Sequence, residues 1–152
     1  MPNLIRLLAI GVLLCATGTS IAGERFDGAW TTKLTCPPKG STQGYTWEFP
    51  ATIQSSSFRG EHGAAGEPGY LILMGKIADD GNAKLTANGV VASRQYARGV
   101  FAHKGEDYSY DVKAQFKDAE GTGTRNEGLG IVGRPCVFEF QKQTNAAAVP
   151  GR

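Results

Sequence analysis

The chain has few of the residues that mark a catalytic or metal site. It contains three cysteines and two histidines in 152 residues, and His62 and His103 lie in different segments. Neither histidine has a second ligand at metal-binding spacing. Glu61 and His62 are adjacent, so on a strand they would point to opposite faces rather than act as an acid/base pair. No serine stands in a Gly-x-Ser-x-Gly elbow, and Ser55 to Ser57 have the composition of a turn. The sequence therefore predicts no catalytic residue, no metal site, no cofactor and no enzymatic activity.

The chain also has no large excess of charge of one sign. Lysine and arginine number 16 against 14 acidic residues, interspersed along the chain, for a formal net charge of +2. This balance lacks the basic footprint of a nucleic-acid-binding protein. Gly121 to Arg125 resembles a phosphate-binding loop in composition only, because no helix follows it. Charged residues at 20% and hydrophobic ones at 41% exclude a disordered chain.

Only the start of the chain carries a long apolar run. Leu4 to Leu14 is almost wholly apolar, Arg6 precedes most of it, and small residues stand at Ser20 and Ala22. This order predicts a secretory signal peptide over residues 1–22 and a location in the periplasm or outside the cell. A membrane anchor is the alternative, but a run of about a dozen residues is shorter than the roughly 20 that a span needs. Lipidation of Cys15 is less favoured, because Leu14 stands where a small residue is required.

Two cysteines remain after cleavage, Cys36 and Cys136. In an exported protein such a pair is best explained as one disulfide. Because the bridge would close a loop of about 100 residues, its stabilisation in the chain-entropy model is about 4.7 kcal/mol.

The remaining residues predict one all-β domain over 23–143 and a flexible tail over 144–152. The sequence lacks long stretches with apolar residues at helical spacing, which argues against a helical bundle. Short runs of alternating apolar and polar residues, separated by turns, indicate strands. We expect strands over 29–36, 45–54 with a bend or edge at Pro50, 58–62, 70–78, 83–91, 108–116, 121–126 and 134–142, with a brief one over 99–102. Residues 63–69 and 92–106 are expected loops, and residues 79–82 an expected turn.

The alternation also predicts which side chains face the core. Segment 108–116 places Tyr108, Tyr110, Val112, Ala114 and Phe116 inward. Glu48, Asp111 and Glu139 fall on outward faces. Segment 70–78 is apolar on both faces and is expected to be buried or central in the sheet.

About eight antiparallel strands in a meander predict a closed or nearly closed barrel, with a two-sheet sandwich as the alternative. If the first and last strands pair antiparallel beside the Cys36–Cys136 bridge, Leu34 lies opposite Phe138. The same register places Thr32 opposite Phe140 and Trp30 opposite Lys142. Since a slip of one residue would invert the faces, this agreement between register and alternation supports closure.

A resemblance follows from several motifs spread over nearly the whole domain. The motifs are Phe26-Asp27-Gly28-Ala29-Trp30 before Cys36, Tyr45-Thr46-Trp47-Glu48-Phe49-Pro50, Gly60-Glu61-His62-Gly63, Glu67-Pro68-Gly69, Asp80-Gly81-Asn82-Ala83 and Arg134-Pro135-Cys136. Together they resemble an uncharacterised domain of secreted proteobacterial proteins, which implies a compartment and a fold but no chemistry. Gly28-Ala29-Trp30 also resembles the opening of lipocalin-like barrels, in which an arginine of the last strand packs on the tryptophan. Here Lys142 is nearest in register and Arg134 lies at the far end, so the likeness is one of fold.

Five aromatic residues are the candidates for a ligand site: Trp30, Tyr45, Trp47, Tyr108 and Tyr110. If they gather at one barrel mouth, they line a pocket for a lipid, a sugar or an aromatic ligand. The alternative is that they fill the core. His62 is a further candidate, either as a ligand-binding residue or as a hydrogen-bonded residue that orders the loop after it.

The sequence thus predicts a monomeric, non-enzymatic protein that binds a small amphipathic or envelope-derived ligand. The alternative is an interaction or inhibitor module that binds an envelope protein through residues 60–69 or 92–106. We expect no nucleic-acid partner, and no membrane span after the signal peptide is cleaved.

Overall fold

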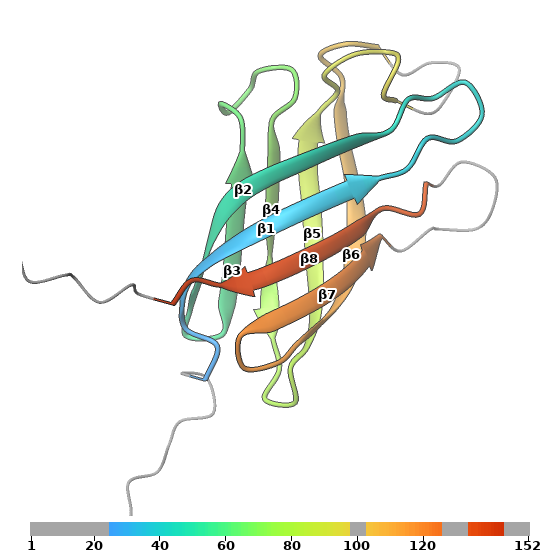
Figure 1. Cartoon of the computed structure of the whole chain (residues 1–152). Helices are drawn as coiled ribbons and strands as arrows, with labels where there is room; N and C mark the ends of the chain where they lie inside the picture. Colours follow the sequence, from blue (N-terminus) through green and yellow to red (C-terminus); the bar gives the residue numbers. More distant parts are fainter. Residues whose placement is uncertain (1–24, 98–102, 126–133, 145–152) are drawn as a thin grey trace, which may run out of the picture.

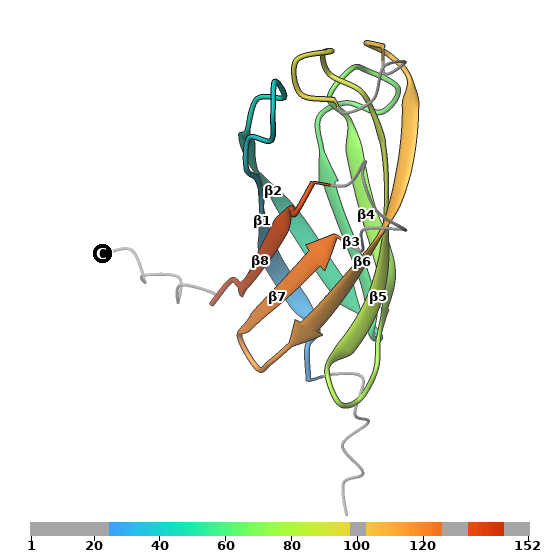
Figure 2. The ribbon, with the colours of Figure 1, turned by 90° about the vertical axis from the view of Figure 1, so that its right-hand side faces the viewer.

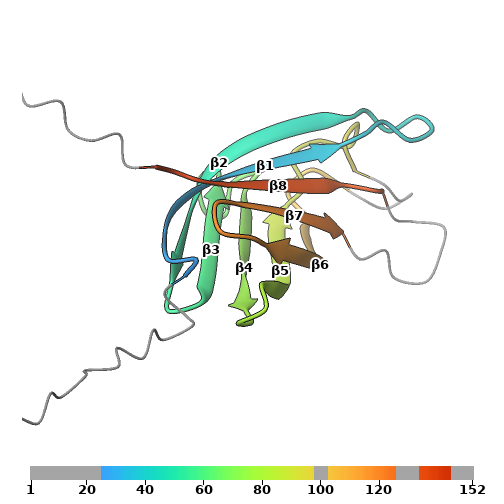
Figure 3. The same ribbon diagram turned by 60° about the horizontal axis from the view of Figure 1, so that its bottom comes forward.

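The computed structural model describes residues 25–97, 103–125 and 134–144, which form a closed eight-stranded antiparallel barrel (Figure 1). The strands are β1 (Gly28–Cys36), β2 (Tyr45–Gln54), β3 (Ser57–His62), β4 (Leu71–Ile77), β5 (Asn82–Val90), β6 (Asp107–Phe116), β7 (Glu120–Arg125) and β8 (Val137–Lys142). Each strand pairs with the next in the chain, and β8 returns to β1, as the view in Figure 3 shows. The predicted all-β meander is confirmed as a barrel rather than a sandwich.

The closure between β1 and β8 has the register that the sequence predicts. Leu34 lies opposite Phe138, Thr32 opposite Phe140 and Trp30 opposite Lys142. A disulfide joins Cys36 to Cys136, with 2.07 Å between the sulfurs, where β1 ends and β8 begins. The bridge and the ladder therefore hold the same two strands together.

The two ends of the barrel differ in their connections (Figures 1 and 2). Tight turns at 55–56, 78–81 and 117–119 join strands at one end, called here the closed end. The longer connections, which include residues 37–44, 63–70 and 91–97, lie at the other end, called here the open end. Since chain direction alternates from strand to strand, a residue's place along its strand decides to which end it belongs.

The closed end is filled by aromatic side chains. Trp30 is fully buried, its indole Nε1 donates a hydrogen bond to the carbonyl of Phe26 at 2.8 Å, and its ring meets Phe116 edge-on at 5.5 Å. Phe58 and Phe140 complete this packing, with ring centres 5.3 Å apart. The lumen is therefore a packed core at this end and offers no space for a ligand.

Two turns at the closed end adopt left-handed backbone conformations. Ser55 and Ser56 have φ values of 49° and 62°, and the carboxylate of Asp27 accepts hydrogen bonds from both of their N–H groups. Gly81 has a φ of 85°, and a Cβ there would lie 2.1 Å from the carbonyl oxygen of Phe116. The expected turns at these positions are confirmed, and the second one requires glycine.

Two expectations for the strands hold only in part. Segment 70–78 is central, because β4 pairs with both β3 and β5, but it is not buried on both faces: only alternate residues face the core, and Met74 is 38% exposed on the outside of the barrel. Pro50 does not bend the chain out of β2, which continues through it opposite Thr31, but the expected edge is present on its other side. The β2–β3 ladder begins only at Ala51, so on that side the missing N–H of Pro50 breaks no ladder bond. The expected signal peptide, the strand over 99–102 and most of the expected tail lie outside the described residues.

Reduction of the disulfide should lower the free energy of unfolding by about 2–5 kcal/mol, because the bridge restrains a long loop in the unfolded chain. Urea unfolding with and without a reductant measures this loss. Alkylation followed by intact-mass measurement gives the control: Cys36 and Cys136 should react only after reduction. Reaction of both thiols in the unreduced protein would contradict the bridge.

Candidate functional site

A half-open pocket of about 190 Å³ lies at the open end of the barrel, between β2, β6, β7 and residues 91–97. Its aromatic lining consists of Tyr45, Trp47, Tyr96, Tyr108 and Tyr110. Small side chains of residues 91–93 and 97 and the charged residues Glu106, Asp107, Arg125 and Arg134 complete it. We call this space the mouth pocket.

One wall of the mouth pocket is a stack of rings carried by β2. The Tyr45 and Trp47 ring centres are 4.6 Å apart, because both side chains point inward from positions two apart on the strand. The ring of His62 stacks against Trp47 at 4.3 Å, and its Nδ1 lies 2.9 Å from the carbonyl oxygen of Gly69. His62 therefore anchors the loop after β3 and supports the Trp47 side chain.

The other wall is carried by β6. The rings of Tyr108 and Tyr110 lie parallel with their centres 5.9 Å apart. Tyr108 can lie close to β5 because its register partner there is Gly89, where a Cβ would come within 2.5 Å of the phenol. The hydroxyl of Tyr110 is buried, and no described residue forms a hydrogen bond with it. Such a donor is costly to leave unpaired in a folded protein.

Two arginines line the pocket and have different partners. Arg134 is buried, and its guanidinium donates hydrogen bonds to the carbonyl oxygens of Gln43, at 2.5 Å, and of Tyr96. Its guanidinium also lies 5.1 Å from the Tyr45 ring centre. Arg125, at the end of β7, places its guanidinium 4.2 Å from the Tyr110 ring centre. Among the described residues, no ion pair includes Arg125.

The rim on the β1–β2 side is tied together by contacts between distant segments. The N–H of Gln43 donates to the carbonyl of Gln95 at 2.8 Å, and Arg134 links Gln43 to Tyr96. Arg134 stands two residues before the disulfide-bonded Cys136. The covalent bridge thus fixes the segment that positions Arg134, and Arg134 positions Tyr96 over Tyr45, whose ring it meets edge-on at 5.9 Å.

The phenols of the pocket are held in their protonated form. Burial raises the pKa of Tyr45, of Tyr108 and of Tyr110 above the ordinary value, and the charges of nearby arginines oppose this shift without cancelling it. All three hydroxyls therefore remain hydrogen-bond donors at neutral and moderately alkaline pH.

These shifts predict that stability falls in alkali. Up to about pH 10 the phenols are protonated in both folded and unfolded chains, so they add no pH dependence. At higher pH the unfolded phenols ionise while the folded ones stay neutral, so the free energy of unfolding should decrease as pH rises. Urea unfolding at about pH 8 and about pH 11 measures the loss, which should be smaller in Tyr110→Phe. An equal loss in that variant would contradict the burial of this phenol.

The structure brings four of the predicted site residues together and separates two. Tyr45, Trp47, Tyr108 and Tyr110 line one pocket, whereas Trp30 belongs to the core of the closed end. His62 lies behind Trp47 and is not part of the lining.

Sequence reasoning missed Tyr96, Arg125 and Arg134 as members of the site. Alternation along the strands could have identified the two arginines as inward-facing residues. Arg125 shares the inward face of β7 with Gly121 and Gly123, and Arg134 continues the inward alternation of Cys136. Tyr96 lies in a segment outside any strand, where alternation carries no information.

The other titratable groups of the described residues do not gather into a second site. Glu48, Asp111 and Glu139 are exposed on the outer wall as predicted, and Glu139 pairs with Lys33 at 3.1 Å. In the part of the chain that the structure describes, no three histidine, cysteine, aspartate or glutamate side chains come close enough to hold a metal ion. The same residues include no helix that is long and apolar enough to cross a membrane.

Comparison of this chain with protein-family models, with curated proteins and with solved structures finds no match. The resemblance to a secreted proteobacterial domain therefore stays a prediction, and function has to be argued from the site itself.

Proposed function

We propose that this protein is a non-enzymatic binding protein that holds a small amphipathic ligand in the mouth pocket. The observation that carries the proposal is the pairing of two aromatic walls, Tyr45 with Trp47 and Tyr108 with Tyr110, around a half-open space that also contains an unpartnered buried hydroxyl. Apolar walls with a few directed polar groups are the usual composition of small-molecule sites.

The size of the space supports a small ligand. A cavity of about 150 Å³ takes up benzene in an engineered protein, and the mouth pocket offers about 190 Å³. Because the closed end is packed with Trp30, Phe116 and Phe140, a longer ligand cannot extend down the barrel axis. The pocket therefore suits one aromatic ring with a polar substituent, and any longer chain would extend into solvent.

Two observations support an exported location for this binding protein. A disulfide forms in an oxidising compartment, and the first 22 residues have the order of a secretory signal. We therefore place the binding protein in the periplasm or outside the cell, where ligands derived from the envelope or the surroundings are available.

The two tryptophans give a direct test, because Trp47 lines the mouth pocket and Trp30 lies buried at the closed end. The exported protein is titrated separately with benzoate, benzamide and benzamidine while tryptophan emission is recorded. At least one compound should change the emission, and the change should disappear in Trp47→Phe but persist in Trp30→Phe. If none of the three compounds alters the wild-type emission, the pocket is not a ligand site, and a protein contact through the open-end loops becomes the better proposal.

A further inference from the structure

We propose that the ligand of the mouth pocket is a small aromatic carboxylate whose oxygens are bound by the Arg125 guanidinium and the Tyr110 hydroxyl. This inference rests on the proposed function and adds to it the charge and shape of the ligand. Three features of the pocket support it: a hydroxyl with no acceptor among the described residues, a guanidinium with no ion pair among them, and two aromatic walls.

The donor is the Tyr110 hydroxyl. It is buried, it belongs to the lining of the mouth pocket, and no described residue accepts its hydrogen bond. Proteins rarely leave such a group unpaired, and its position at a half-open space makes a ligand oxygen the natural acceptor. Because burial keeps this phenol protonated, it can donate over the whole neutral range.

The cation is Arg125. It faces inward from the end of β7, opposite Val112 of β6, and its guanidinium lies over the Tyr110 ring at 4.2 Å. No ion pair of the described residues neutralises it. Arg134 differs, because its N–H groups already serve the carbonyls of Gln43 and Tyr96. Arg125 is therefore the guanidinium with donors left for a ligand, and its planar fork matches a carboxylate.

Two acidic residues also line the pocket, and by themselves they would favour a cationic ligand. Glu106 and Asp107 are exposed at the rim, and the Glu106 carboxylate accepts a hydrogen bond from the N–H of His103 at 2.7 Å. The Arg125 guanidinium lies over the inward Tyr110 ring, whereas Glu106 and Asp107 lie at the exposed rim, which favours an anionic group placed inward.

The walls favour a planar ring beside that group. Tyr45 and Trp47 on one side and Tyr108 and Tyr110 on the other present aromatic surfaces, and aromatic pairs gain stability from stacked or edge-on contacts. An aromatic ring that carries a carboxylate can pack against the walls, pair with the Arg125 guanidinium and accept a hydrogen bond from the Tyr110 hydroxyl.

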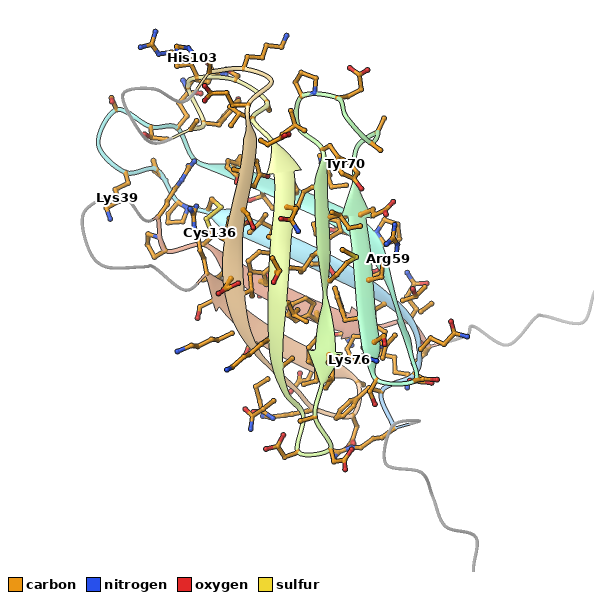
Figure 4. The ribbon with its side chains drawn as sticks, turned by 180° about the vertical axis from the view of Figure 1, so that it is seen from behind. Lys39, Arg59, Tyr70, Lys76, His103 and Cys136 are labelled. Carbon is orange, nitrogen blue, oxygen red and sulfur yellow. A yellow bond between two sulfur atoms is a disulfide. The ribbon has the colours of Figure 1, made fainter. Side chains whose placement is uncertain are left out.

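Three isosteric compounds separate the charge from the shape: benzoate is an anion, benzamide is neutral and benzamidine is a cation. At pH 7.5 the exported protein should bind benzoate about tenfold more tightly than benzamide, and benzamidine most weakly. In Arg125→Gln the preference for benzoate over benzamide should disappear. The matched control is Arg59→Gln, on the outer wall of β3 (Figure 4), where the preference should stay unchanged.

The hydroxyl is tested with Tyr110→Phe, which keeps the ring. Benzoate and benzamide both offer an acceptor oxygen, so both should bind several-fold more weakly, whereas Tyr70→Phe, outside the mouth pocket, should leave them unchanged. The midpoint of urea unfolding should not fall in Tyr110→Phe, because the hydroxyl that is removed has no protein partner.

The outcomes distinguish the two proposals. Binding of none of the three compounds overturns the proposed function. Binding of benzamide or benzamidine as tightly as benzoate, or a benzoate preference that survives Arg125→Gln, leaves a ligand pocket but overturns the carboxylate. A lowered unfolding midpoint in Tyr110→Phe with unchanged binding removes the hydroxyl from the site.

Discussion

Replacement of Trp30 by alanine should destabilise the barrel by about 3–5 kcal/mol, a large part of the total stability of a domain of this size. The Trp30 side chain is fully buried, packs against Phe116 and donates its indole N–H to the carbonyl of Phe26. The substitution would leave a cavity in the closed end and an unpaired carbonyl, and both effects reduce the free energy of unfolding.

The matched variant is Trp47→Ala, which truncates the same side chain at the opposite end. Trp47 is half-buried and borders the mouth pocket, so the truncated site is open to water and leaves no sealed cavity. Its cost in stability should be much smaller, and binding of aromatic compounds should be lost instead. Urea unfolding of both variants makes the comparison. Equal losses of stability would contradict the division into a packed end and a ligand-binding end.

Leu85→Asp should prevent folding, whereas the neighbouring substitution Lys84→Asp should be neutral or slightly stabilising. Leu85 is buried between Gly75 and Val112 in the register of β4, β5 and β6, and an aspartate there would be an unpaired charge in the core.

Lys84 lies on the outer wall between two other lysines. Its register partners are Lys76 of β4, seen on the outer face in Figure 4, and Lys113 of β6. Like charges directly opposite each other destabilise a sheet, so an aspartate at the centre of this row replaces two repulsions with two attractions. Thermal unfolding of the two variants tests the assignment of faces in β5. A folded Leu85→Asp protein with a melting temperature near that of Lys84→Asp would contradict it.

The closure of the barrel was predictable because two independent patterns agree. Alternation identifies the inward residues of β1 and β8, and the Cys36–Cys136 pair selects one register between them. The same alternation failed for β4, since an apolar outer residue such as Met74 looks identical in sequence to a buried one. In a small barrel the outer face of a strand can stay apolar without being covered.

The mouth pocket was predictable only in part, because alternation identifies a face and not a height along the barrel. Trp30 near the start of β1 and Trp47 near the start of β2 both point inward, yet adjacent strands run in opposite directions, so they lie at opposite ends. The contact between Arg134 and Tyr96 joins residues 38 apart in sequence and depends on a segment outside any strand. Such a contact comes from the packing of the open-end connections, which no local pattern records.

The most direct test of the central claim is a map of amide chemical shifts of the disulfide-bonded protein during titration with benzoate. If the mouth pocket holds an aromatic carboxylate, the shifts should concentrate on residues 45–47, 108–110 and 125, and they should weaken in Arg125→Gln. Shifts that gather on the outer lysine row of Lys76, Lys84 and Lys113, or no shifts at any residue, would contradict it.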